Sequence, residues 1–195
     1  SPYVDVETIV LAFSILKSLG LNDIKVCLNT LGDDESRANY RSALKEYFAP
    51  YVDELCGDCK RRYEQNPLRI LDCKVDHDHE CMKNAPKMSD YLNEASQEYF
   101  NTVCELLDKL EIPYEVDDKL VRGLDYYTHT VFEIVSMNSE MGAQSTVLAG
   151  GRYDGLISYF GGPEGMSGIG WALGMERLLI ALEAEGIELE QKPAL

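Results

Sequence analysis

Three short segments carry the residue types best suited to binding a ligand: RGLDYY at 122–127, AGGRYDG at 149–155 and GIGWALGMERLL at 168–179. The first combines an arginine with two tyrosines. The other two are rich in glycine, which lets the backbone come close to a bound group. Together the three segments predict a site where backbone and side chains converge on a small ligand.

Arg122 and the two tyrosines suit different parts of such a ligand. The guanidinium of Arg122 is planar and permanently charged, so it can bind an anionic group with two parallel hydrogen bonds. Tyr126 and Tyr127 offer rings with polar tips, which suit a small aromatic or heteroaromatic group. The alternative is structural: Arg122 pairs with Asp125, and both tyrosines pack within a sheet.

The third segment reads as a strand that leads into a helix with Glu176 and Arg177 in its first turn. This order would place Arg177 at one edge of a sheet cleft, whereas the alternative is a surface ion pair on an amphipathic helix. Neither a GxxxxGK phosphate loop nor a spaced dinucleotide fingerprint is present, which excludes nucleotide binding by those two routes.

Cysteines and histidines between 56 and 81 raise the question of a zinc site. A CxxC pair with further Cys and His nearby has suitable ligands. The spacing from Cys73 to Cys81 is long for a tight knuckle, however, and His77 and His79 lie in an acidic loop. We therefore expect reduced cysteines and no bound metal. The alternative is zinc held by Cys56, Cys59, Cys73 and Cys81.

A basic cluster lies in the same region of an otherwise acidic chain. It consists of Lys60, Arg61, Arg62, Arg69 and Lys74. Such density is typical of a solvated helix face, and the functional alternative is contact with a phosphate backbone.

The surrounding pattern predicts the elements that position these residues. A helix that Asp5 could cap precedes a strand at 24–28, and strands are expected at 127–135 and 146–149 before a helix that begins near Gly174. Residues 33–112 read as helical, with Ser89 as the cap of a long helix. These elements predict an α+β fold.

Composition limits the classes of protein further. The 195 residues carry 18 Lys and Arg against 34 Asp and Glu, for a net charge of -16. This balance argues against a broad nucleic-acid-binding face, so a polyanion would have to meet a local basic cluster. No apolar run is long enough to span a membrane, and no secretory signal is visible, so six cysteines are expected to stay reduced in the cytoplasm.

The three segments, in this order, resemble the histidyl-tRNA synthetases of the bacterial type. LVRGLDYYTHTVFEIV at 120–135 is similar to the family's histidine signature, and GGRYDGL at 150–156 to its glycine-rich substrate strand. GIGWALGMERLL resembles motif 3 of class II synthetases, and DVETIVLAFSILKSLGL the helix that follows motif 2.

The resemblance implies a class II catalytic core, that is, an antiparallel sheet flanked by helices with a helical insertion domain. It divides the chain into core residues 1–32, insertion 33–112 and core 113–195. The implied activity is ATP-dependent activation of histidine and its transfer to tRNA(His), with Mg²⁺ in the full enzyme. A homodimer is implied for the full-length protein.

The resemblance also implies a role for each site residue. Arg122 would be the catalytic arginine at the α-phosphate and the histidine carboxylate, and Arg177 would bind ATP. The implied histidine-binding residues are Tyr126, Tyr127, Gly150 and Gly151. The insertion domain, with Lys60, Arg61, Arg62, Arg69 and Lys74, would approach the tRNA acceptor stem.

Motifs 1 and 2 and the anticodon-binding domain of the family have no counterpart in this sequence. We therefore expect a segment of a synthetase that is inactive by itself. A different function is implied by the family's paralogue, a non-catalytic histidine-binding regulatory subunit of ATP phosphoribosyltransferase. That paralogue tends to lose the RGLDYY detail and the motif 3 arginine region, both of which are present here.

Overall fold

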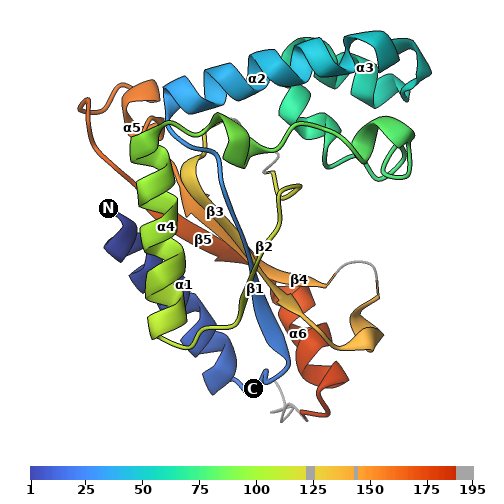
Figure 1. Cartoon of the computed structure of the whole chain (residues 1–195). Helices are drawn as coiled ribbons and strands as arrows, with labels where there is room; N and C mark the ends of the chain where they lie inside the picture. The colour runs from blue at the N-terminus through green and yellow to red at the C-terminus, as the bar shows by residue number, and fades with distance from the viewer. Residues whose placement is uncertain (122–125, 143–144, 188–195) are drawn as a thin grey trace.

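A five-stranded sheet forms the centre of the protein (Figure 1). The computed structural model describes residues 1–121, 126–142 and 145–187. The strand order is β2-β1-β3-β4-β5; β1 and β2 are parallel and every other neighbouring pair is antiparallel. The strands are β1 (Ile24–Thr30), β2 (Tyr114–Val116), β3 (Thr128–Ser136), β4 (Thr146–Arg152) and β5 (Ile169–Leu173). The predicted α+β class is confirmed, and the second expected strand extends beyond 149 to Arg152.

Three helices cover one face of this sheet. They are α1 (Pro2–Ser18), α4 (Glu94–Lys109) and α6 (Met175–Ala184). Figure 1 shows α1 and α4 side by side, and the two helices pack against each other. Their apolar residues join every second residue of the strands in one core, for example Ile9, Val103, Phe132, Ile134 and Leu148. Since side chains alternate along a strand, the opposite face carries the intervening residues.

Residues 34–92 form a helical unit with its own core. Its elements are α2 (Asp34–Phe48), η1 (Ala49–Glu54), α3 (Gly57–Gln65), η2 (Pro67–Ile70), η3 (Glu80–Met82) and η4 (Met88–Tyr91). Tyr40, Leu44 and Phe48 line the buried side of α2 at helical spacing. Tyr127 and Val131 belong to the same cluster, so this core continues onto the sheet beside β3.

Helix α4 lies within the range 33–112 expected for the insertion, yet its core side chains pack with the sheet. Val103 and Leu107 are fully buried in the core of the sheet and its helices. The helical unit defined by packing therefore ends before α4, and the domain boundaries at 32 and 112 stay predictions. Two short elements, η5 (Ser139–Met141) and α5 (Leu156–Tyr159), complete the fold.

Two predicted helix caps are wrong. Helix α1 begins after Ser1, and Asp5 is buried inside its first turn instead of capping it. Helix α4 begins after Asn93, whose side chain accepts a hydrogen bond from the backbone N–H of Ser96 at 2.9 Å. Ser89 lies in the preceding 3-10 turn, η4. No helix in the described ranges is long and apolar enough to cross a membrane.

Asp5 instead forms a buried ion pair with Arg152 at the end of β4. Arg152 donates from Nε to Asp5 Oδ1 at 3.1 Å and also from Nη2. Asp5 Oδ2 accepts hydrogen bonds from Tyr99 Oη at 2.9 Å and Thr130 Oγ1 at 2.6 Å. Burial alone would lower the pKa of Arg152, but its bonds to Asp5 raise it. Four separate elements, α1, α4, β3 and β4, therefore meet at one carboxylate.

We predict that Asp5→Asn lowers the free energy of unfolding by about 3 kcal/mol, because it removes the fully buried counter-charge of Arg152 and leaves only the partly exposed Asp154, at 2.7 Å from Nη1. Urea denaturation would measure the change. Asp23→Asn, at an exposed aspartate, is the matched control and should change little. Equal effects of the two substitutions would contradict a structural role for this ion pair.

Candidate functional site

Tyr126 and Tyr127 lie together at the start of β3. Their ring centroids are 4.4 Å apart, and Tyr126 Oη donates to Tyr127 Oη at 3.4 Å. Tyr127 is only 8% exposed and packs into the core of the helical unit, whereas Tyr126 is half-buried. Tyr153 approaches the ring of Tyr126 edge-on at 6.1 Å. The two predicted tyrosines are therefore neighbours, but they differ in their access to a ligand.

Gly151 lies against Tyr127. A Cβ placed on Gly151 would stand 2.8 Å from Tyr127 Cδ1 and 2.7 Å from the carbonyl oxygen of Thr130. At Gly150 a Cβ would stand 2.3 Å from the carbonyl oxygen of Gly170 on the next strand. Close packing within the sheet therefore requires both glycines.

Small residues lie on one face of β4 and β5, the face that α1, α4 and α6 do not cover. Ala149 pairs with Ala172, and Gly151 pairs with Gly170. These four residues alternate with the core residues of both strands, so they share the face opposite to α1, α4 and α6. A flat ligand could therefore approach the backbone of β4 and β5 closely.

Arg177 lies beyond the other end of β4 and β5, in the helix that follows β5. It is half-buried in the first turn of α6, and the preceding Gly174 donates from its N–H to the carbonyl oxygen of Val147 at 3.1 Å. Val147 and Gly151 are four residues apart on β4, or about 13 Å along a strand. Arg177 and the tyrosine pair are thus separated across the sheet. Arg122 lies outside the described residues.

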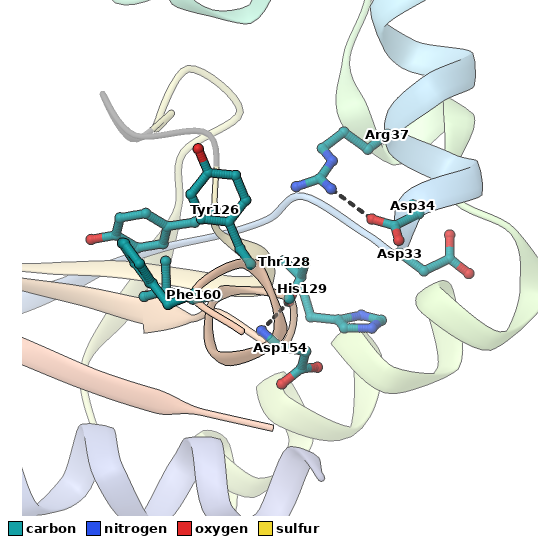
Figure 2. Close-up of a pocket in the computed structure, with 11 residues that line it drawn as sticks. Asp33, Asp34, Arg37, Tyr126, Thr128, His129, Asp154 and Phe160 are labelled. Carbon is teal, nitrogen blue, oxygen red and sulfur yellow. Dashed lines mark hydrogen bonds and ion pairs between the residues drawn. The ribbon is translucent and has the colours of Figure 1, made fainter. Parts of the chain in front are cut away.

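A cavity of about 870 Å³ opens next to Tyr126, between the start of β3, the first turn of α2 and α5. Figure 2 shows Tyr126 and Phe160 on one side and Arg37 with Asp34 on the other. Arg37 donates to Asp34 Oδ1 at 2.6 Å and to the carbonyl oxygen of Tyr127 at 2.5 Å. Among the predicted site residues that fall within the described ranges, Tyr126 alone lines this cavity.

His129 also lines the cavity, although the sequence did not single it out. Its backbone has a φ of +46°, at an irregularity in the pairing of β3 with β4. Its ring stacks on Tyr99 at 4.5 Å, and its buried Nδ1 has no hydrogen-bond partner in the described part of the chain. Burial lowers the pKa of His129, which favours the neutral ring.

The predicted basic cluster is only partly available for binding. Lys60, Arg61 and Lys74 are exposed, but Arg61 pairs with Asp58 at 2.7 Å. Arg62 and Arg69 are half-buried, and Arg62 donates from Nη1 to the carbonyl oxygen of Arg69 at 3.0 Å, which ties α3 to η2. Part of the cluster therefore has a structural role.

The predicted zinc ligands are also only partly brought together. Cys56, Cys59 and Cys73 lie in one group, and its fourth member is Asp76. Cys81 lies outside that group, and its Sγ is 3.0 Å from His79 Nδ1. The sequence signal missed Asp76 because a carboxylate in an acidic loop does not stand out among its neighbours.

The fold matches a solved class II synthetase. The apo histidyl-tRNA synthetase of S. aureus is 43% identical in sequence, with a TM-score of 0.76, over 97% of this chain and 46% of that chain. The predicted class, a class II sheet flanked by helices, is confirmed.

Sequence relatives narrow the class to one family. Residues 1–178 match the family model described as histidyl-tRNA synthetase. Proteins named histidine–tRNA ligase from Lysinibacillus sphaericus and Listeria monocytogenes are 53% and 50% identical over 189 and 194 residues, or 97% and 100% of this chain. The chain belongs to the histidyl-tRNA synthetase family. It spans 44% and 45% of the length of those two relatives.

The regulatory-subunit alternative gains less from these comparisons. A Bacillus halodurans structure titled as an ATP phosphoribosyltransferase regulatory subunit/histidyl-tRNA synthetase is 21% identical, with a TM-score of 0.58 over 93% of this chain. At that identity the likeness extends to the fold alone. The chain is 53% and 43% identical to proteins named as a histidine–tRNA ligase and a histidyl-tRNA synthetase, well above that level.

We predict that Gly151→Ala lowers the free energy of unfolding by about 1–3 kcal/mol, since the added methyl group must displace the ring of Tyr127. Near-ultraviolet circular dichroism should change with it, because the tyrosine pair moves. Gly155→Ala is the matched control: a Cβ there meets nothing within 4 Å. If both variants unfold alike in urea, the contact between Gly151 and Tyr127 does not restrict this position.

Proposed function

We propose that this chain forms part of a histidine–tRNA ligase, which activates histidine with ATP and then transfers the histidyl group to tRNA(His). One observation carries the proposal. The tyrosine pair of the RGLDYY segment packs on Gly151 at one end of β4, and Arg177 follows the end of β5 at the other end of that strand pair. Such an arrangement suits an extended ligand with an imidazole at one end and a nucleotide at the other.

The imidazole of histidine would lie beside Tyr126 and Tyr127. Tyr126 is the more accessible of the two and can offer its ring face and its hydroxyl. Tyr127 is buried, so its contribution would be to fix the position of Tyr126 and of the Gly151 backbone. Gly151 would let the amino acid approach the strand without a side chain in the way, while Gly150 would let β4 and β5 pack closely beneath it.

Two arginines would bind the charged parts of the reactants. Arg122 would contact the histidine carboxylate and the α-phosphate, and Arg177 would contact ATP. In the first step a carboxylate oxygen forms a bond to the α-phosphorus, the bond to the β-phosphate oxygen breaks, and pyrophosphate leaves. Charge on the phosphoryl oxygens grows in this step, and guanidinium groups stabilise it without proton transfer. Mg²⁺ would neutralise further phosphate charge.

Macromolecular partners are part of the same proposal. The acceptor stem of tRNA(His) would meet the helical unit through Lys60, Arg61 and Lys74, which are exposed, with Arg62 and Arg69 in a supporting position. A homodimer of the full-length protein is proposed from the resemblance to the family. Its location in the cytoplasm stays a prediction.

A chimaera tests the activity directly. This chain would replace the aligned 189-residue segment of the Lysinibacillus sphaericus protein, which is 53% identical to it. We predict histidine-dependent exchange of pyrophosphate into ATP by the chimaera. Arg122→Ala should lower the exchange rate by about 10²–10³-fold, as expected for loss of a charge-stabilising group. The chain alone should give no exchange.

Arg41→Ala is the matched control for this experiment, because Arg41 is exposed on α2 outside the cavity. It should leave the rate unchanged. Two results would contradict the proposal: equal rates for Arg122→Ala and the unchanged chimaera, or exchange by the chain alone above that of its own Arg122→Ala variant.

The tRNA contact is tested by charge reversal at the exposed lysine and arginine. We predict that Lys60→Glu with Arg61→Glu in the chimaera weakens tRNA(His) binding at low salt. The slope of log affinity against log salt should fall by about 0.7–0.9 for each phosphate that the protein no longer neutralises. Arg62 is left intact because it holds the carbonyl of Arg69.

Lys17→Glu with Lys109→Glu gives the same change of net charge away from the cluster, at the ends of α1 and α4. Filter binding or fluorescence anisotropy over a salt series would compare the two pairs. Equal reductions in affinity would mean that only the net charge of the chain matters, and that Lys60 and Arg61 make no local contact with tRNA.

A further inference from the structure

Three cysteines and one aspartate gather in the helical unit, at a distance from the substrate-binding face. One ligand atom from each of Cys56, Cys59, Cys73 and Asp76 lies within 4.8 Å of all the others. Cys56 directly precedes α3, and Cys59 lies in the first turn of that helix. Cys73 and Asp76 lie in the turn that follows η2. The group therefore joins two segments on either side of η2.

The distances within the group fit a tetrahedral metal site. Zinc–sulfur bonds of about 2.3 Å at tetrahedral angles place two sulfurs about 3.8 Å apart. The Sγ atoms of Cys56 and Cys73 are 3.8 Å apart, and the Sγ of Cys73 is 3.5 Å from Asp76 Oδ2. A disulfide needs a sulfur–sulfur distance of about 2.0 Å. The arrangement thus provides four ligands around one centre.

The carboxylate of Asp76 is buried, which favours a positive charge beside it. Its side chain is only 8% exposed, and its oxygens accept hydrogen bonds from the backbone N–H of Cys56 at 3.2 and 3.1 Å. Within the described ranges no lysine, arginine or histidine forms an ion pair with Asp76. Hydrogen bonds from the Cys56 N–H and the Cys73 thiol offset part of the cost of burying this carboxylate, and a bound metal ion would supply the missing positive charge.

The backbone around the sulfurs suits thiolates. The N–H of Asp76 donates to the Sγ of Cys73 at 3.4 Å. Cys56 and Cys59 stand at the N-terminal end of α3, where the unpaired N–H groups of a helix favour negative charge. Hydrogen bonds of this kind hold metal-bound sulfurs in place.

We propose that Cys56, Cys59, Cys73 and Asp76 bind one Zn²⁺ ion that fixes the start of α3 to the turn after η2. Thiolates select zinc over the hard cations magnesium and calcium, and four ligands of this type suit its tetrahedral geometry. Binding releases the thiol protons to solvent and changes no oxidation state. The ion holds α3, with Lys60 and Arg61, in a fixed position relative to Lys74.

Cys81 provides the matched control because it is buried in the same unit but lies outside the group. The chain would be purified under reducing conditions without added metal, and zinc would be measured by elemental analysis. We predict one zinc per chain in the unchanged protein and in Cys81→Ser. Cys73→Ser should lose at least nine-tenths of it.

Cobalt serves as a second probe that does not depend on how well a variant folds. Co²⁺ added to the metal-depleted, reduced chain should give the intense visible bands of a tetrahedral site and a sulfur-to-cobalt charge-transfer band. Asp76→Asn should weaken binding of Zn²⁺ in chelator competition by at least about 10-fold, because loss of a ligand should cost no less than loss of a group that only orients one.

Two results would overturn the proposal. The first is less than one-tenth of a zinc per chain in the unchanged protein, together with no charge-transfer band from Co²⁺. The second is a disulfide between Cys56 and Cys73 in protein prepared without reductant, seen as a mass lower by a pair of hydrogen atoms, with zinc absent from the reduced form as well.

Discussion

The buried pair between Asp5 and Arg152 is the contact on which the arrangement of the sheet and its helices depends. A carboxylate that is shielded from water must have every lone pair satisfied, and here α1, α4, β3 and β4 all supply or receive one of its bonds. Arg152 ends the strand that carries Gly151. The pair therefore sets where β4 lies relative to the helices beneath it.

The sequence predicted the elements of the fold well, because period and composition decide them locally. Alternation along β3 and the small residues of β4 were visible without a structure. The predicted caps at Asp5 and Ser89 are wrong, and the cause is physical. A polar side chain near the start of a helix can bond to the backbone of that helix or to a distant partner, and only tertiary contacts decide which.

The roles given to the site residues stay predictions, and their arrangement could not be read from the sequence. Segment resemblance singled out the tyrosines and Arg177, whereas the burial of Tyr127 and the position of His129 follow from contacts with segments about 30 or more residues away. The sequence suggested Cys81 as the fourth possible zinc ligand, but the structure places Asp76 beside Cys56, Cys59 and Cys73 instead. The conformation of the turn after η2 decides which side chain reaches the group, and residue type and spacing do not reveal that conformation.

Strand β3 belongs to both hydrophobic clusters at once. Phe132 and Ile134 pack with the helices of the sheet, while Val131 and the preceding Tyr127 pack with the helical unit. Side chains of β3 thus pack in two hydrophobic cores, so a change of packing in one core would shift the strand and disturb the other. A substitution deep inside the helical unit would therefore be transmitted to Gly151 and β4 through the ring of Tyr127, so the volumes of the two cores are not independent of each other.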